Sequence, residues 1–296
     1  MDHSVLVIGE SLMSVLRSGK DERRTPGGSP MSVALGLGRL GVDTQLLTRI
    51  GNDSDGAATW KKLKDAGVQV VGSSFDSSPT SFAVATLRDD GSTDFELDFH
   101  WSLPSLVGLK LRKWLHVGSL GTFVNPGADS LEHFLRSVSG SATISYDPNI
   151  PPSFVSDQDA LVARFERIAS LSHVVRLSST DATRLYPGLT AEFVVDKVLS
   201  LGVKVVALTR GVAGALVSTH SHTIEAPAPR VTLVDCVGAG DSFTAALILG
   251  LLSTGRDPNS ARLTTVATRA VLAASIACTR AGNEPPTLDE VTTKSR

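Results

Sequence analysis

The sequence is poor in cysteine, carries almost no excess charge and has no long apolar run. Its two cysteines, Cys236 and Cys278, lie far apart in the sequence and exclude both a disulfide framework and a zinc spacing. The 28 lysines and arginines are matched by 30 aspartates and glutamates, so the charge predicts no nucleic-acid partner and no contact with a membrane surface. The longest strongly apolar stretch, Phe243–Leu252, is about half the length that a membrane span needs.

The amino-terminal residues also lack the features of a signal peptide. Met1 leads almost directly into a strand-like apolar run, without a basic start or a small-residue cleavage site. We therefore expect a soluble, cytoplasmic, globular protein. The 296 residues, of which 42% are hydrophobic and 20% charged, can bury a substantial core and allow one large α/β domain or two ordinary ones.

Short apolar, β-branched runs alternate with helical patterns along most of the chain. This alternation predicts βαβ units and a mostly parallel sheet that is covered on both faces. The predicted strands are Ser4–Ile8, Thr44–Arg49, Trp114–Val117, Thr143–Tyr146, His173–Leu177, Lys204–Leu208 and Ala215–Ser218. The predicted helices are Met31–Leu40, Gly56–Ala66, Ser130–Val138, Asp157–Ala169, Thr190–Leu201, Gly240–Ser253 and Ser260–Thr279.

One interval interrupts this alternation. Ser81–Phe99 contains two runs of alternating hydrophobicity around Asp89-Asp90-Gly91, which is the pattern of a β-hairpin. A hairpin among βαβ units is expected to stand away from the main sheet as a flap or lid. The polar segment Arg17–Arg24 could add an edge to it.

A glycine loop between an apolar run and a long apolar helix gives the sharpest functional signal. A β-like run at Val231–Val234 leads toward Gly238-Ala239-Gly240, where the helix begins. Free backbone N–H groups and the positive end of the helix dipole make such a loop an anion site. Asp241, in the first helical turn, either complements the dipole or acts as a general base on a hydroxyl that attacks phosphorus, and the residues alone leave both open.

A second glycine-rich segment, Thr25–Gly41, contains a match to the dinucleotide fingerprint G-x-G-x-x-G. That fingerprint belongs at a turn between strand and helix, whereas here the apolar positions continue through it at helical spacing. We therefore interpret Gly36 and Gly38 as close-packing positions on a helix and Gly41 as its carboxyl-terminal cap. The glycines available to a small polar ligand are Gly27-Gly28, before the helix.

A third glycine element is the segment Ala207–Leu216. A strand is expected to end at Thr209, a glycine turn follows, and a second strand begins near Ala215. An ordinary β-turn fits this pattern. A contact of Thr209 and the Gly211 amide with a nucleotide phosphate fits it as well.

In this order and spacing, the segments resemble the ribokinase-like (PfkB) family of sugar kinases over essentially the whole chain. Gly27–Gly41 resembles the family's G-G-x-x-x-N-x-A…L-G signature, and Gly51–Gly56 its G-x-D-x-x-G turn. Asp147-Pro-Asn149 resembles its D-P-N element, and Ser178–Asp181 stands where the family carries N-x-x-E or S-x-x-E. Asp235–Asp241 resembles the D-T-x-G-A-G-D signature, which is the most specific of these motifs.

The resemblance implies a ribokinase-like three-layer α/β/α fold with a mostly parallel central sheet. Residues 1–296 would form a single kinase domain, with a small β lid contributed by about residues 12–26 and 74–101. It further implies ATP and Mg²⁺ as cofactors, K⁺ as a candidate monovalent cation, a small sugar as substrate and a homodimer formed through the lid.

The resemblance also implies roles for individual residues. Asp241 would be the catalytic base, and the amides of Gly238, Ala239 and Gly240 would form an anion hole for the transferred phosphoryl group. Asp181 would help to organise Mg²⁺ through water, and Asp235 would help to bind a monovalent cation. The nucleotide would contact Ser178, Asp181, Thr209, Gly211, Gly214 and Gly240. The sugar would contact Ser14, Gly27, Gly28, Ser32 and Asp241. The alanine-rich segment Ala270–Cys278 would lie near the adenine, although a plain buried helix fits it equally well.

Three positions depart from the family pattern, and all three concern the sugar. Gly9–Ser14 resembles the G-E-A-L-I-D start of fructokinases and 2-keto-3-deoxygluconate kinases, but Ser14 replaces the aspartate. Ser32 replaces the asparagine of the first signature, and Pro151 replaces the arginine that often follows D-P-N-x. Serine is shorter and uncharged, and losing a charge-assisted hydrogen bond costs about 1.5–3 kcal/mol. The pattern predicts intact phosphoryl transfer with a rebuilt sugar site.

The leading interpretation is an ATP-dependent kinase acting on a primary hydroxyl of fructose or of a related ketose or keto-sugar acid. One alternative is a nucleoside kinase of the same family. The other is a non-catalytic pseudokinase that senses a sugar or a nucleotide. Ser14 and Ser32 favour the pseudokinase, whereas the complete run Gly238–Asp241 opposes it, because a sensor has less need of a base.

Overall fold

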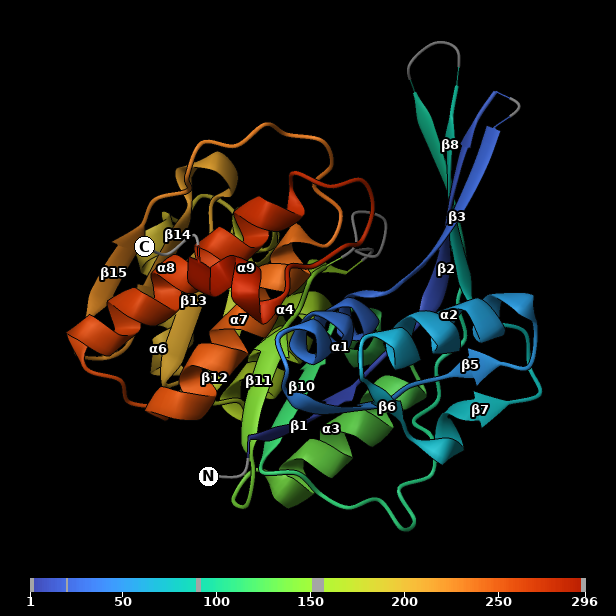
Figure 1. The fold of residues 1–296 in the computed structure, drawn as a ribbon. Coiled ribbons are helices and arrows are strands. Elements are labelled where there is room, and N and C mark those ends of the chain that lie inside the picture. The colour runs from blue at the N-terminus through green and yellow to red at the C-terminus, as the bar shows by residue number, and fades with distance from the viewer. Residues whose placement is uncertain (1–2, 20, 89–91, 151–156, 294–296) are drawn as a thin grey trace.

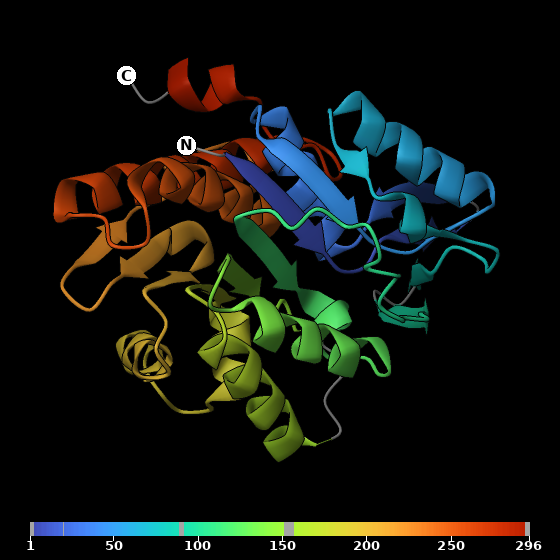
Figure 2. The same ribbon diagram turned by 90° about the horizontal axis from the view of Figure 1, so that it is seen from below.

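The computed structural model describes residues 3–19, 21–88, 92–150 and 157–293. A nine-stranded sheet has the order β15-β14-β13-β12-β11-β10-β1-β4-β6 and forms the middle of three layers (Figures 1 and 2). Its strands from β13 to β6 pair in parallel. Strand β14 pairs antiparallel with β13, and β15 pairs antiparallel with β14. The strands are β1 (Ser4–Ile8), β4 (Asp43–Leu47), β6 (Gln69–Val70), β10 (Trp114–Gly118), β11 (Thr143–Asp147), β12 (Val174–Ser178), β13 (Val205–Thr209), β14 (Ala215–Ser218) and β15 (Thr223–Ala226).

Helices cover both faces of this sheet, which confirms the predicted α/β/α architecture. On one face lie α1 (Ser29–Arg39), α2 (Ser54–Asp65), α7 (Ala239–Thr254), α8 (Ser260–Ala277) and α9 (Leu288–Thr293). On the other lie α3 (Gly127–Val138), α4 (Gln158–Ser170), α5 (Ser179–Leu185) and α6 (Ala191–Ser200). Strand alternation divides β1 between two cores: Val5 and Val7 pack under α1 and α7, whereas Leu6 and Ile8 pack against α3. Within the described part of the chain, no helix has the length and apolar character of a membrane span.

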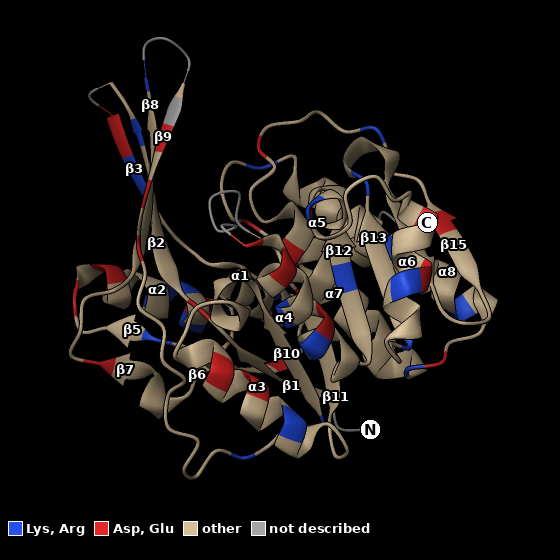
Figure 3. Cartoon of the chain, turned by 180° about the vertical axis from the view of Figure 1, so that it is seen from behind, with Lys and Arg blue, Asp and Glu red and all other residues tan. Residues whose placement is uncertain are grey.

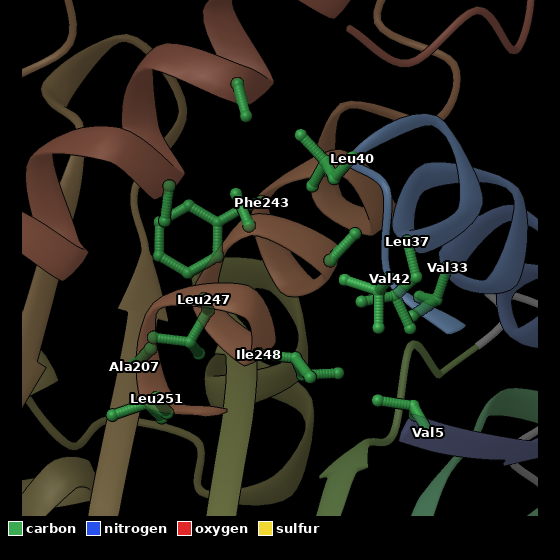
Figure 4. Close-up of a cluster of buried hydrophobic side chains, with 14 of the residues drawn as sticks. Val5, Val33, Leu37, Leu40, Val42, Ala207, Phe243, Leu247, Ile248 and Leu251 are labelled. Carbon is green, nitrogen blue, oxygen red and sulfur yellow. The ribbon is translucent and has the colours of Figure 1, made fainter. Parts of the chain in front are cut away.

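The packing of α1 against α7 confirms the interpretation of the glycine-rich segment Thr25–Gly41. A Cβ built on Gly36 would lie 2.8 Å from the Ala245 side chain, and one on Gly38 would lie 2.4 Å from the Ala66 carbonyl oxygen. Gly41 has φ +79° and follows the helix as its cap. Figure 4 shows the apolar side chains around this contact, among them Leu37 and Ile248. The fingerprint match is therefore a helix-packing feature.

The lid is a separate four-stranded sheet that projects from the main body (Figure 1). Its strands are β2 (Leu12–Ser18), β3 (Asp21–Gly27), β8 (Phe82–Leu87) and β9 (Thr93–Asp98), in the order β3-β2-β8-β9. The predicted hairpin at Ser81–Phe99 is confirmed as β8 and β9, although its turn, Asp89-Asp90-Gly91, lies outside the described residues. Arg17–Arg24 belongs to a second hairpin, which pairs in parallel with β8 through β2.

The expected β-like run at Val231–Val234 is wrong. These residues form no strand, and the Val231, Leu233 and Val234 side chains are 42%, 64% and 57% exposed. The main sheet ends at β15, and the run does not pair with that edge strand. The Val234 N–H instead donates to the Cys278 carbonyl oxygen (2.9 Å), which ties the segment to the end of α8. Two further short strands, β5 (Ile50–Gly51) and β7 (Phe75–Asp76), form a small parallel pair beside α2.

Candidate functional site

The predicted site residues gather at the carboxyl edge of the parallel strands. Asp147 ends β11, Ser178 ends β12 and Thr209 ends β13. The α7 N-terminus faces this edge, since Thr244 of its second turn donates a 2.7 Å hydrogen bond to Asp147. In open α/β sheets, ligands bind outside this edge of the strands. The fold therefore brings together segments that are widely separated in the sequence.

The glycine loop at the start of α7 has the geometry of an anion site. Gly238 is the N-cap residue in the left-handed conformation, with φ +75°, and no side chain caps the helix. The N–H groups of the first turn lack carbonyl partners within the helix and are available to a ligand. One predicted donor is engaged in this structure, because the Ala239 N–H donates to the Cys236 carbonyl oxygen at 3.2 Å.

Asp241 lies in the first turn of α7 and contacts the other glycine segment. The Ser29 hydroxyl, at the start of α1, donates to its Oδ1 at 2.6 Å. Burial raises the pKa of the Asp241 carboxyl to about 7, against the opposing effect of the Ser29 hydrogen bond. A carboxylate with this pKa, beside an anion site, is suited to accept a proton near neutral pH.

The predicted sugar contacts lie on β2 and around the start of α1. Ser14 is exposed on the lid. Gly28 has φ +99°, and a Cβ there would lie 2.8 Å from the Glu10 carbonyl oxygen, so only glycine fits. Ser32 is buried, donates to the Gly28 carbonyl oxygen (2.8 Å) and accepts a hydrogen bond from the Asn283 side chain (2.7 Å). Its hydroxyl is therefore already used within the protein.

Asp181 and Ser178 form the capping box of α5. The Asp181 Oδ2 accepts hydrogen bonds from the Ser178 N–H (2.9 Å) and hydroxyl (2.5 Å), and its Oδ1 accepts one from the Ile150 N–H (2.8 Å). The described residues contain no group of three or more His, Cys, Asp or Glu placed to hold a metal ion. Mg²⁺ that arrives on nucleotide phosphates keeps several waters. The remaining lone pair of Oδ1 fits contact with such an ion through water rather than directly.

The turn between β13 and β14 contains the other predicted nucleotide contacts. Gly211 has φ +56° and leaves the space beside it open. Gly214 has φ +86°, and a Cβ there would lie 2.0 Å from the Ala226 carbonyl oxygen. The Thr209 hydroxyl accepts a 2.6 Å hydrogen bond from Arg176. The alanine-rich stretch Ala270–Cys278 forms the end of α8, where Ala270 and Ala273 are buried in the core.

Asp235, the predicted cation ligand, joins the glycine loop to the chain after α8. Its two carboxylate oxygens accept hydrogen bonds from the N–H groups of Val237 (3.0 Å) and Gly282 (2.8 Å). Partial burial raises the pKa of this carboxyl, but these two N–H groups and the charge of Arg23 outweigh burial and hold the pKa below its ordinary value. Asp235 is therefore a charged ligand candidate at neutral pH.

Three buried polar residues of the site were not predicted from the sequence. Arg176 pairs with Asp147 beneath the glycine loop. The Asn283 side chain lies between Ser32 and Gly238, where a Cβ on Gly238 would be 2.5 Å from its Oδ1. Glu10 accepts a 2.9 Å hydrogen bond from the Gly121 N–H, and burial raises its pKa to about 7. The signal for Arg176 is a lone charge in an otherwise apolar predicted strand, His173–Leu177.

The sheet edge, the glycine loop at the helix N-terminus and the buried Asp241 carboxyl have the arrangement expected of an α/β phosphotransferase. The model of the "pfkB family carbohydrate kinase" matches residues 3–290. The chain belongs to this family, whose members transfer a phosphoryl group from ATP with the help of a divalent metal. It is 30% identical over 263 residues to a fructokinase of Rhizobium leguminosarum bv. trifolii, covering 83% of this chain and 79% of that one.

Solved structures share the fold. A fructokinase double mutant from Vibrio cholerae O395, in a form with fructose, ADP and potassium ion, superposes with a TM-score of 0.84 at 24% identity, over 99% of this chain and 98% of that one. The aminoimidazole riboside kinase from Salmonella enterica, with aminoimidazole riboside and an ATP analog, gives a TM-score of 0.83 at 23% identity, over 98% and 99% of the two chains. The predicted family and ribokinase-like fold are confirmed.

Proposed function

We propose that this kinase phosphorylates a primary hydroxyl of fructose or of a related ketose or keto-sugar acid. The observation that carries the proposal is the position of Asp241. Its carboxyl touches the Ser29 hydroxyl, one residue after Gly28, and lies in the first turn of α7, so the predicted sugar segment and the predicted phosphate segment share one proton acceptor. The fructokinase relative supports fructose as the first candidate.

The reaction requires a proton acceptor and a site for the transferred charge. Asp241 takes the proton of the acceptor hydroxyl, whose oxygen then attacks the γ-phosphorus of ATP while the bond to ADP breaks. The N–H groups of Gly238 and Gly240 neutralise the charge that develops on the phosphoryl oxygens, and the Ala239 N–H would join them only on leaving the Cys236 carbonyl oxygen. Thr209 and the glycines of the β13–β14 turn hold the ATP phosphates. Asp181 would contact Mg²⁺ through water, and the bound ion would neutralise phosphate charge.

A nucleoside kinase is the second candidate. The structural likeness to the aminoimidazole riboside kinase and the altered sugar positions Ser14 and Ser32 favour it. Ser14 is uncharged, so the site offers a neutral group where the family pattern has an aspartate. The Ser32 hydroxyl is already hydrogen-bonded within the protein. Pro151, the third altered position, lies outside the described residues.

A coupled ADP-release assay with Mg²⁺, ATP and K⁺ tests these alternatives. The panel contains fructose, 2-keto-3-deoxygluconate, ribose, tagatose, inositols and nucleosides. We expect a ketose or keto-sugar acid to stand well above the others. A nucleoside as the best acceptor would establish the second candidate. No turnover from protein that binds ATP would indicate the pseudokinase.

The proposal includes K⁺ as the monovalent cation near Asp235. The carboxylate is ionised and lies on the loop that precedes the anion site. We expect K⁺ to raise turnover relative to tetramethylammonium, and Asp235→Asn to remove most of this activation. Equal rates in the two salts would contradict this part of the proposal.

The proposal also includes a homodimer formed through the lid. In the pairing register, Leu16, Ala85 and Phe95 lie side by side on one face of the lid. Leu16 is 42% and Phe95 74% exposed, so this apolar row has no cover within the protomer. Sedimentation velocity should show a dimer that Phe95→Glu dissociates, whereas Val107→Glu, at an exposed site outside the lid, should leave it intact. On the main body, lysines and arginines are interspersed with aspartates and glutamates (Figure 3).

A further inference from the structure

Arg176 is a buried cation whose position is explained neither by apolar packing nor by contact with solvent. It lies on β12 between Val175 and Leu177, and its side chain is 8% exposed. Its Nη1 is 3.3 Å from both carboxylate oxygens of Asp147, whose side chain is fully buried. Burying such a pair is costly, and well-packed apolar residues often give equal or greater stability. A role in the site is therefore a better explanation than stability.

The guanidinium lies directly behind the glycine loop. A Cβ built on Gly240 would be 2.8 Å from Nη2 and 3.0 Å from Nη1 of Arg176. Asp147, the other member of the pair, also contacts α7, because the Thr244 hydroxyl donates a 2.7 Å hydrogen bond to it. The first two turns of α7 thus lie against the Arg176–Asp147 pair, and a side chain at position 240 would displace the guanidinium.

The same guanidinium fixes the orientation of the Thr209 hydroxyl. Its Nη2 donates a 2.6 Å hydrogen bond to Thr209 Oγ1, which occupies an acceptor lone pair of that oxygen. The hydroxyl proton has only a long contact, 3.4 Å, with the Leu177 carbonyl oxygen. A phosphate oxygen would be a better acceptor for this proton. Arg176 therefore presents Thr209 to a nucleotide as a hydrogen-bond donor.

We propose that Arg176 is a positioning residue for phosphoryl transfer: held by Asp147, it supports the glycine loop at Gly240 and orients Thr209 toward the nucleotide. The inference rests on the proposed roles of the loop and of Thr209. The positive charge of Arg176 also acts on Asp241, the proposed proton acceptor. Burial, Asp147 and Glu10 raise the pKa of Asp241, whereas the Ser29 hydroxyl and Arg176 lower it. Arg176 itself stays charged, because burial lowers its pKa but Asp147, Asp181 and Asp241 outweigh burial.

The test compares Arg176→Met, Arg176→Lys and the double variant Arg176→Met/Asp147→Asn, which leaves no unpaired buried charge. For folded Met variants, we expect kcat to fall by about 10-fold to about 100-fold and MgATP affinity, measured by calorimetry, to fall by about 10-fold. In Arg176→Met, the acid limb of kcat/KM should move to higher pH. Arg176→Lys keeps the charge and should keep the limb in place. Thr209→Val keeps the pair and should weaken MgATP binding alone.

Arg164→Met is the matched control. Arg164 on α4 is also largely buried, at 12%, and pairs with Glu132 and Asp129, but it contacts neither Gly240 nor Thr209. It should lose stability without changes in kcat, MgATP affinity or the acid limb. A folded double variant with wild-type values of kcat and MgATP affinity would overturn the proposal. Calorimetry needs no sugar, so weakened MgATP binding in Arg176→Met supports the inference even if the proposed sugar activity fails.

Discussion

Ser29 and Asp241 are 212 positions apart in the sequence, yet the Ser29 hydroxyl donates a 2.6 Å hydrogen bond to the Asp241 carboxylate. This contact joins the N-terminus of α1 to that of α7, the two helices that follow the glycine segments. Because a hydrogen bond to a carboxylate favours its charged form, Ser29 opposes the burial that raises the pKa of Asp241. The relationship therefore influences the pH range in which Asp241, the proposed base, is ionised.

Replacing Asp241 with asparagine should remove the proton acceptor and keep its shape. We expect Asp241→Asn to lower kcat by about 10²-fold to about 10⁴-fold while MgATP affinity changes little. Steady-state kinetics with the best acceptor and calorimetry with MgATP measure the two quantities. Ser29→Ala, which retains the carboxylate, is the control and should keep most of the turnover. Near wild-type turnover in Asp241→Asn would remove Asp241 from this role.

The pH dependence of kcat/KM should show an acid limb near pH 7. The carboxyl has a pKa of about 7 and accepts a proton only when ionised, so activity is lost as the pH falls through this value. Ser29→Ala removes a hydrogen bond that favours the ionised form, so the pKa should rise and the limb should move to higher pH. A limb that stays in place in this variant would contradict the pKa assignment.

Gly38 should tolerate no side chain, although we propose no role for it in binding or catalysis. A Cβ there would lie 2.4 Å from the Ala66 carbonyl oxygen and 2.8 Å from a Val68 methyl group. We expect Gly38→Ala to cost about 1–3 kcal/mol of unfolding free energy. Gly140→Ala is the control, because a Cβ at Gly140 meets nothing within 4 Å. Denaturant titrations measure both variants, and equal stabilities would contradict the packing account of α1.

His116 should make the protein less stable in acid. Burial lowers the pKa of its imidazole to about 3, so below the unfolded value of 6.5 the unfolded chain binds a proton that the folded chain rejects. Between pH 7 and pH 5 this costs about 2 kcal/mol. Glu10 and Asp241 act with the opposite sign, because burial raises their pKa values to about 7.

The measurable quantity is therefore a difference between two proteins. His116→Leu should remove the acid-dependent loss that His116 contributes, so the unfolding free energies of variant and wild type should diverge by about 2 kcal/mol from pH 7 to pH 5. His220→Leu, at an exposed histidine, should show no such divergence. Parallel pH profiles for His116→Leu and wild type would show that His116 is not buried in neutral form.

Local patterns predicted most of the fold. The runs at Ser4–Ile8 and Ala215–Ser218 are strands with the predicted bounds. Both runs are short and apolar, which indicates a buried strand rather than a helix. The continuation of helical spacing through Gly36 and Gly38 correctly excluded a dinucleotide site. Val231–Val234 failed because apolar composition does not show whether a strand edge is available for pairing.

The candidate site was predicted only in part. Motif order indicated Asp241 and the glycine loop, and both lie at the sheet edge. The pairs Arg176–Asp147 and Ser32–Asn283 could not be predicted, since each joins residues that have no local pattern in common. The Ser32 hydroxyl, for which the resemblance implied a sugar contact, hydrogen-bonds Gly28 and Asn283.

The sequence by itself determined the succession of strands and helices along the chain, the close-packing role of Gly36 and Gly38, and the resemblance to the family. These follow from hydrophobic period, turn chemistry and motif spacing, which act over a few neighbouring residues. Only the tertiary structure decided that Asp241 meets Ser29, that its pKa lies near 7, and that a buried arginine supports the loop above it. Burial and the field of nearby charges depend on all the elements packed around a group, so they exist only once the chain has folded.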